Sequence, residues 1–325
     1  MATQQTAGDA PVGRFAGLFD AVVANVARVI QGKEEATRLA LVCIAAQGHL
    51  LIEDVPGVGK TTLAKALARS FGLEWRRIQF TPDLLPSDVT GASVWDRNSG
   101  KFTFRPGGIF ANVVLGDEIN RASPKTQSAL LEAMEERQVT VDATTYQLPA
   151  PFLVMATQNP ADHEGTYPLP ESQLDRFLLR VRMGYPDRGA EIAMLDHQAH
   201  GPSVDDLDAV VGTDAVATMV ALANRIHVAA PLKGYIVDLA AATRRHPSLS
   251  LGMSPRAALA LQRAARALAA ACGRDYATPD DVKTLIGPVL AHRMVLSPEA
   301  AIGGGGMSDI LAEVLRSVPV PSGRG

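Results

Sequence analysis

Cysteine, aromatic side chains and long apolar runs are all scarce in this chain of 325 residues, and each scarcity excludes a class of protein. The two cysteines, Cys43 and Cys272, each lie in an Ala-rich apolar stretch, so we expect two buried free thiols rather than a disulfide or a metal site. Aromatic residues make up 5% of the chain, so aliphatic, Ala-rich helices should dominate the packing. The longest apolar run, residues 39–46, is far shorter than the roughly 20 residues that span a bilayer, so no membrane span is expected.

A targeting segment and a strong charge of one sign are also not evident. The first ten residues are polar and lack the apolar stretch of a signal peptide, and free thiols fit a reducing compartment, so we expect a soluble cytoplasmic protein. The formal net charge is -3, and the densest basic cluster is Arg244-Arg245-His246. Nucleic-acid binders usually carry a basic patch or stripe, so no nucleic-acid partner is expected, although a local basic pore lining stays possible.

Hydrophobic residues, at 47% of the chain, are sufficient for a sizeable core in one large domain or in a domain plus a smaller one. In the first part of the chain, short apolar runs alternate with segments of helical periodicity, which predicts an α/β fold with a parallel sheet covered by helices on both faces. The expected strands are residues 49–53, 78–80, 113–116, 152–157 and 178–183. The expected helices are residues 15–30, 34–47, 61–70 and 124–137.

The pattern becomes helical from about Met194, with expected helices at residues 216–229, 255–272, 279–291 and 308–317. Ser254-Pro255 and Thr278-Pro279 each place an N-cap residue before a proline at the first helical position. We therefore divide the chain into four parts: a disordered tail (1–11), an α/β core (12–193), a linker (194–215) and a smaller all-helical lid (216–325) with a flexible Gly-rich segment at 303–306.

The most informative motif is Asp54-Val55-Pro56-Gly57-Val58-Gly59-Lys60-Thr61-Thr62, which lies between an expected strand and an amphipathic helix. This context is typical of a phosphate-binding P-loop. Gly57 and Gly59 allow backbone N–H groups to face the phosphates, Lys60 can reach the β- and γ-phosphates, and Thr61 can hold Mg²⁺. The segment from Pro56 to Thr62 is therefore predicted to bind ATP. Asp54 stands where the usual motif has its first glycine, and a tight turn with a chance Gly-Lys-Thr is the alternative.

Two acidic residues follow the expected strand Val113–Gly116. Asp117, at the carboxyl end of the strand, would face the P-loop across the crevice of the sheet and hold Mg²⁺ directly or through water. Glu118 would polarise the attacking water. An exposed acidic turn before a helix is the alternative, because acids favour helix N-termini. The position of Asp117, 57 residues after Lys60 and after an expected strand, favours ATP hydrolysis.

Together these motifs resemble the AAA+ ATPases, and closely the MoxR branch. The resemblance runs from about residue 14 to the end of the chain. It is carried by EDVPGVGKT (53–61), FTPDLLPSD (80–88), GDEINRA (116–122), ATQNP (156–160) and LDRF (174–177). Asp54 in place of glycine is similar to what that branch uses, so this departure from the usual motif matters little.

The resemblance implies roles for four further residues. Asn159 matches sensor 1, which orients the water, and Arg176 matches the arginine finger offered to the γ-phosphate of a neighbouring subunit. Arg256 matches sensor 2, at a lid helix start that can swing toward the phosphates, and Ile30 lies in the segment beside the adenine. From the residues alone, Asn159 could be a turn residue, Arg176 could pair with its neighbour Asp175, and Arg256 could be a solvated helix residue.

Two expected hairpins, residues 92–104 and 139–148, turn at residues 97–100 and 142–144. In AAA+ rings such hairpins face the pore or the partner; ordinary sheet extensions are the alternative. The resemblance implies an ATP-driven, chaperone-like remodeller that forms a homo-oligomeric ring, a hexamer, with a von Willebrand A domain partner, often in metal-cofactor insertion or complex assembly. A nucleic-acid motor and a non-hydrolysing nucleotide switch are the alternatives. The net charge argues against the first, and the set of Asp117, Glu118, Asn159 and Arg176 argues against the second.

Overall fold

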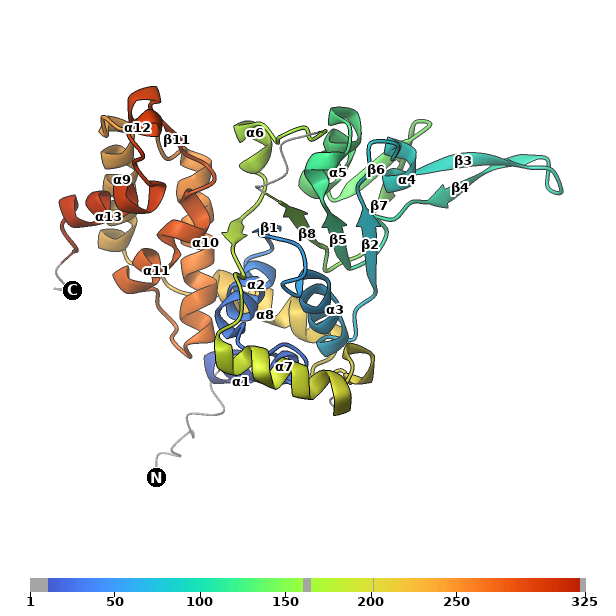
Figure 1. Ribbon diagram of the computed structural model, residues 1–325, viewed down its shortest axis with the longest axis horizontal. Helices are drawn as coiled ribbons and strands as arrows, with labels where there is room; N and C mark the ends of the chain where they lie inside the picture. The colour runs from blue at the N-terminus through green and yellow to red at the C-terminus, as the bar shows by residue number, and fades with distance from the viewer. Residues whose placement is uncertain (1–10, 160–164, 201, 322–325) are drawn as a thin grey trace.

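A five-stranded parallel sheet organises the first part of the computed structural model, which describes residues 11–159, 165–200 and 202–321 (Figure 1). The strand order is β2-β5-β8-β1-β9, and every pairing within this sheet is parallel. The strands are β1 (Leu50–Glu53), β2 (Trp75–Gln79), β5 (Val113–Asp117), β8 (Leu153–Gln158) and β9 (Leu179–Val181). All five predicted strands are present, and the predicted parallel sheet is confirmed.

The sheet is buried on both faces because successive side chains of each strand enter different apolar clusters. Leu50 and Ile52 of β1 pack in the cluster that contains the apolar faces of the first three helices, whereas Leu51 packs in the cluster of α5. The helices of this half are α1 (Pro11–Ala27), α2 (Glu34–Ala45), α3 (Lys60–Ser70), α4 (Pro86–Thr90), α5 (Pro124–Glu136), α6 (Glu171–Leu174) and the 3₁₀ helix η1 (Ile119–Arg121).

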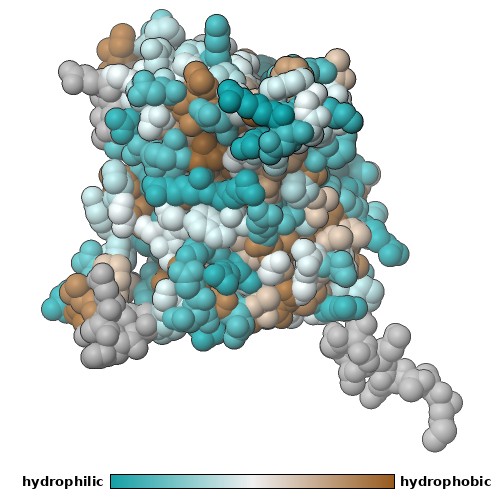
Figure 2. Space-filling model, turned by 90° about the vertical axis from the view of Figure 1, so that its right-hand side faces the viewer, coloured by the Kyte–Doolittle hydropathy of each residue, from teal (hydrophilic) through white to brown (hydrophobic). Residues whose placement is uncertain are grey.

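Two antiparallel hairpins are present, and their turns lie within the residues predicted for them. Strands β3 (Gly91–Asp96) and β4 (Lys101–Pro106) form the first, and β6 (Gln138–Val141) and β7 (Thr144–Gln147) form the second. The second has a two-residue turn in which Asp142 and Ala143 both have positive φ, as a tight hairpin turn requires. The first hairpin projects from the body of the molecule (Figure 1). On that side of the molecule, hydrophobic patches lie among a mostly hydrophilic surface (Figure 2).

The last part of the chain, from α9 to α13, forms a helical lid with one β element in addition, whereas α7 and α8 lie beside the first helices of the core (Figure 1). Ser254 and Thr278 accept hydrogen bonds from the first turns of α10 and α11, so both predicted N-caps are confirmed. Strands β10 (Leu249–Leu251) and β11 (Val295–Leu296) form a short antiparallel pair that the all-helical prediction omits. The helices are α7 (Arg188–His200), η2 (Val204–Asp206), α8 (Thr213–Arg225), α9 (Ala230–Arg245), α10 (Pro255–Ala271), α11 (Pro279–Leu290), α12 (Pro298–Ile302) and α13 (Met307–Ser317).

Several predicted boundaries need correction. Pro11 begins α1 instead of ending the tail, and the rest of the predicted tail lies outside the described residues. Residues 194–200 of the predicted linker form the second half of α7, and the helix expected at 216–229 ends at Arg225. Helix α8 packs against α1 and α2 as well as against α10. Helical periodicity alone did not predict these packing partners, and the helix α9 was missed.

The two cysteines differ in burial. Cys43 is fully buried, and the loss of solvation raises the pKa of its thiol. Cys272 is exposed, so the prediction of a second buried thiol is wrong: it follows the last residue of α10, where the chain leaves the packed face. Within the described part of the chain, no helix combines the length and the apolar character needed to cross a membrane.

Candidate active site

The P-loop connects β1 to α3 in a conformation that two glycines permit. Gly57 has φ of +85° and Gly59, the N-cap of α3, has φ of +93°, values that L side chains rarely adopt. Lys60 is the first residue of α3, and its Nζ donates to the backbone oxygen of Asp54 at 2.7 Å. The loop therefore lies at the carboxyl edge of the sheet, with the N-terminus of α3 directed at it. This is the geometry of an anion-binding loop.

Asp54 has a structural role that explains its place in the motif. Its Oδ1 accepts from the N–H of Val55 at 2.8 Å, and its Oδ2 accepts from the N–H of Gly184 at 2.6 Å. The carboxylate thus ties the start of the P-loop to the segment that follows β9. A glycine at this position could not make either bond, so the departure from the usual motif adds an anchor and removes nothing from the phosphate cradle.

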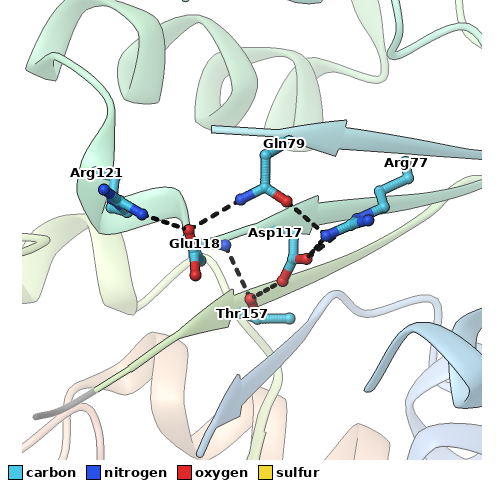
Figure 3. Close-up of polar contacts among 6 residues, drawn as sticks. All are labelled: Arg77, Gln79, Asp117, Glu118, Arg121 and Thr157. Atoms are coloured by element: carbon cyan, nitrogen blue, oxygen red, sulfur yellow. Dashed lines mark hydrogen bonds and ion pairs between the residues drawn. The ribbon is translucent and has the colours of Figure 1, made fainter. Parts of the chain in front are cut away.

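Asp117 and Glu118 are held in place by Thr157 of the neighbouring strand β8 (Figure 3). The Thr157 hydroxyl donates to Asp117 Oδ1 at 2.6 Å and accepts from the N–H of Glu118 at 2.9 Å. Glu118 has φ of 58° and ψ of 49°, a left-handed conformation that is uncommon for a residue with a side chain. Such local strain persists where the surroundings hold it, and it is concentrated at functional sites.

Three further polar side chains surround the two acids, and two of them, Arg77 and Gln79, lie outside the motifs. Arg77 of β2 donates from Nε to Asp117 Oδ2 at 3.1 Å and also binds the same oxygen through Nη2. Gln79 Nε2 donates to Glu118 Oε2 at 2.9 Å, and Arg121 Nη1 donates to the same oxygen at 3.1 Å. The signal that could have found Arg77 and Gln79 is their period of two on a strand, which puts both on one side. The sequence does not show that this strand neighbours β5.

The order of the strands places the acids and the P-loop at a useful separation. Strand β8 lies between β1 and β5, so the P-loop and Asp117 follow strands about 10 Å apart, at the same edge of the sheet. Asn159 directly follows β8, between them, and is 8% exposed. The strand order therefore places Asn159 between the loop and the acids at the carboxyl edge.

The residues at this edge fit a cation shared with a nucleotide. Thr61 and Asp117 offer hydroxyl and carboxylate oxygens, the ligand type that Mg²⁺ prefers, and Mg²⁺ usually takes its remaining ligands from phosphates and water. In the described ranges, no group of three or more His, Cys, Asp or Glu side chains could hold a metal by itself.

The base of the P-loop is tied through Glu53 to β8, the strand that precedes Asn159. Its carboxylate accepts from Gln158 Nε2 at 3.0 Å and pairs with Arg182 at 2.8 Å and Arg180 at 3.2 Å. Burial would raise the pKa of Glu53, but the hydrogen bond from Arg182 and the charge of Arg180 outweigh it, so the pKa is lowered. Ile30, expected beside the adenine, is 9% exposed and packs in the cluster of the first helices. Its contact with adenine stays a prediction.

Arg176 and Arg256 lie together at the opposite edge of the sheet. The N–H of Leu178 bonds the oxygen of His49, just before β1, so Arg176 precedes the start of β9 at the amino edge. Arg256 pairs with Glu135 at 2.8 Å, and Arg176 pairs with the same carboxylate at 3.4 Å. The alternative considered for Arg176, an ion pair with its neighbour Asp175, is not present, because Asp175 pairs with Arg256 and Arg293. Arg256 is therefore beside the predicted finger and away from its own P-loop.

Comparisons with known proteins agree with this geometry. The family described as "ATPase family associated with various cellular activities (AAA)" matches residues 49–179, and the AAA lid domain family matches residues 241–314. The uncharacterized protein YeaC of Bacillus subtilis is 49% identical over 304 residues, covering 94% of this chain and 95% of YeaC. The chaperone MoxR1 of Mycobacterium tuberculosis is 39% identical, covering 97% of this chain and 87% of MoxR1.

A solved structure shares the whole arrangement. The crystal structure of a proposed ATPase from Cytophaga hutchinsonii superimposes with a TM-score of 0.90 at 36% identity, covering 96% of this chain and 97% of that protein. The residues that the two family models match include the P-loop after β1, the acids after β5 and most of the helical lid. This chain belongs to the MoxR-type AAA+ ATPases.

Proposed function

We propose that this chain hydrolyses ATP with Mg²⁺ and uses the free energy for chaperone-like remodelling or assembly of partner proteins. The observation that carries the proposal is the fixed pair of acids, Asp117 and Glu118, held by Thr157 at the same sheet edge as the P-loop. A relative that covers nearly all of this chain is named a chaperone, which favours a remodelling role.

Each group at this edge has a task in the proposed reaction. The P-loop N–H groups and Lys60 hold the phosphates, and Thr61 and Asp117 hold the cation, which offsets the negative charge of the phosphates when bound. Glu118 accepts a proton from the attacking water, and Asn159 orients that water. Val58 and Thr62 complete the loop that follows Pro56.

The second half of the site is proposed to come from a neighbouring subunit in a ring. Arg176 and Arg256 share Glu135 at the amino edge of the sheet, away from their own P-loop, and a cavity of about 140 Å³ opens between them. The charged side chains that line this cavity are Glu135, Arg137, Asp175, Arg176, Arg256, Arg263 and Arg293. Five arginines against two acids leave an excess of positive charge, which suits the phosphates of a neighbour's nucleotide. Arg256 is therefore proposed to act on the nucleotide of the neighbouring subunit, not on the nucleotide of its own P-loop.

The wider setting is a proposal that the family resemblance supports. A hexameric ring in the cytoplasm, a partner with a von Willebrand A domain and a part in metal-cofactor insertion or complex assembly are the working proposal. No nucleic-acid partner is proposed, because the chain carries a net charge of -3.

Two variants of one site test the proposal. Lys60→Ala removes the positive charge between the phosphates and should abolish binding of a fluorescent ATP analogue. Glu118→Gln keeps the shape and the hydrogen bonds of the side chain but cannot accept a proton, so it should bind the analogue normally and hydrolyse ATP about 10²–10⁴ times more slowly. Normal turnover by Glu118→Gln would assign the base to another residue, and normal binding by Lys60→Ala would remove the P-loop from the mechanism.

A further inference from the structure

The carboxylate of Asp117, which is proposed to hold a cation, is already bound by an arginine side chain. Arg77 lies on the edge strand β2, beside β5, and both its Nε and its Nη2 donate to Asp117 Oδ2. The other oxygen, Oδ1, accepts from Thr157. Each carboxylate oxygen offers about two acceptor positions, so the guanidinium takes both positions of Oδ2.

The two oxygens of Asp117 differ in how easily their partners can leave. The bond to Oδ1 belongs to the Thr157 bridge, which also holds the backbone of Glu118, so its loss would disturb the turn between the acids. The bond to Oδ2 involves a side chain that is 47% exposed, whereas that of Asp117 is 13% exposed. Arg77 can therefore move into water at little cost in solvation, and Oδ2 is the oxygen that a cation can take.

A guanidinium and a divalent cation cannot share this oxygen. Both carry positive charge, and at contact distance in a partly buried site they repel each other strongly. Displaced from Asp117, Arg77 keeps a partner nearby, because its Nη2 also donates to Gln79 Oε1 at 2.6 Å. The arginine is thus placed to leave and to return.

We propose that Arg77 is a built-in competitor for the divalent cation at Asp117, so that the Mg²⁺ concentration needed to load the site is set by displacement of this arginine. The inference rests on the proposed function, because it takes Asp117 as a ligand of the cation. It concerns the affinity of the site for the cation and is independent of the rate of hydrolysis.

The test is a titration of Mg²⁺ against binding of a fluorescent ADP analogue by the full chain, with Mn²⁺ paramagnetic resonance as a direct count of bound cation. Arg77→Gln removes the competing charge and should lower the half-saturating Mg²⁺ concentration about three- to tenfold, the range expected for losing a charged hydrogen-bonded pair that is partly exposed. Arg77→Lys keeps the charge but has a less suitable donor geometry. Its half-saturating Mg²⁺ concentration should therefore lie between those of Arg77→Gln and the unchanged protein.

Arg76→Gln is the matched control. Arg76 lies on the same strand, is exposed to a similar extent and pairs with Glu74, away from the acids. The Arg76→Gln substitution removes the same charge and should leave the half-saturating Mg²⁺ concentration within about twofold of that of the unchanged protein, because exposed charges at a distance are screened. All three substitutions are at exposed positions, and a thermal melt confirms that each variant is folded.

The outcomes separate this inference from the proposed function. If Arg77→Gln titrates like the unchanged protein, or needs more Mg²⁺, Arg77 does not compete and the inference is overturned. An equal shift in Arg76→Gln would also overturn it, because the effect would then be one of general charge. If the unchanged protein does not bind the analogue at any Mg²⁺ concentration, the proposed function itself fails.

Discussion

His49 shows how one buried side chain joins three parts of the core. Its Nδ1 accepts from the N–H of Val154 at 3.0 Å, so the proton lies on Nε2, which donates to the oxygen of Met134 at 3.0 Å. The ring also packs edge-on against Phe152. The neutral imidazole therefore has a partner for each nitrogen, and it connects β1, β8 and the end of α5 at the edge where Arg176 lies.

The environment of His49 predicts a loss of stability in mild acid. Burial lowers the pKa of His49 to about 4, whereas the unfolded chain has a value near 6.5. Between these values the unfolded state binds a proton that the folded state does not. The stability contributed by the neutral ring is therefore complete above about pH 6.5 and falls by about 1.4 kcal/mol per pH unit toward pH 4.

The measurement is the urea midpoint of unfolding at intervals between pH 7 and pH 5, where few carboxylates titrate. His292 contributes to the same trend, because burial lowers its pKa to about 3. His49→Gln is less stable at every pH but should lose about half of the dependence on pH that the two histidines cause. An unchanged slope in this variant would mean that His49 is not the neutral, buried group described.

At the scale of elements, the hairpin of β3 and β4 combines a braced base with a free tip. Phe104 stacks on Tyr146 of the second hairpin with ring centroids 3.8 Å apart. Beyond it, Trp95 and Phe102 face each other across the strands with centroids 5.1 Å apart, and they are 52% and 70% exposed. Exposed aromatic pairs of this kind are more typical of contact surfaces than of isolated hairpins. Strand β2, which holds Arg77 and Gln79, leads through α4 into this hairpin.

A double variant of the tip should separate hydrolysis from remodelling. Replacing Trp95 and Phe102 by serine removes the apolar contact surface but leaves the P-loop and the acids unchanged, so basal ATP hydrolysis should stay within about twofold. Protection of a chemically unfolded test protein from aggregation, measured by light scattering, should be lost. Val237→Ser, at an exposed apolar position on α9, is the control and should retain protection. Full protection by the double variant would contradict a role for this hairpin.

At the scale of the whole molecule, the two edges of the sheet carry the two groups of residues that are proposed to form the catalytic site. The P-loop and the acids are at the carboxyl edge, and Arg176 with Arg256 is at the amino edge. A β-strand of four residues is about 13 Å long, so the arginines of one chain do not serve its own phosphates without a large rearrangement. In the proposed ring, the amino edge of one subunit lies against the carboxyl edge of the next.

Mixing two inactive variants tests this arrangement. Arg176→Ala should bind ATP normally and lose about 10³–10⁵ in rate, the range observed for arginine fingers, while Lys60→Ala should not bind ATP. In a mixed ring, an Arg176→Ala subunit supplies an intact P-loop and an adjacent Lys60→Ala subunit supplies the finger. Part of the activity should therefore return in the mixture.

The control for the mixture is a tagged pull-down that shows co-assembly. Mixtures that co-assemble but recover no activity would mean that Arg176 does not act across a subunit boundary. A second check is the activity of the unchanged protein at dilutions at which monomers dominate. Activity that stays proportional to protein concentration there would also mean that Arg176 does not act across a subunit boundary.

Local features of the sequence were sufficient for most of the fold. Short apolar runs predicted every strand of the parallel sheet, the period of 3.6 residues predicted most helices, and Pro after Ser254 and Thr278 located two helix starts. The P-loop was predictable because its function depends on glycines at fixed spacing within one loop. Cys272 shows the limit of such inference: an Ala-rich neighbourhood indicates a helix but does not say which end of it leaves the core.

What the sequence by itself determined is therefore the identity of the elements and the residues of the phosphate loop, since both depend on neighbours within a few positions. Only the tertiary structure decided which distant side chains meet. Arg77 reaches Asp117 because β2 pairs with β5, and Arg256 lies beside Arg176 because of how α10 packs against the core. Strand order and helix docking follow from burying the apolar surface of the whole chain at once, and no local spacing encodes that outcome.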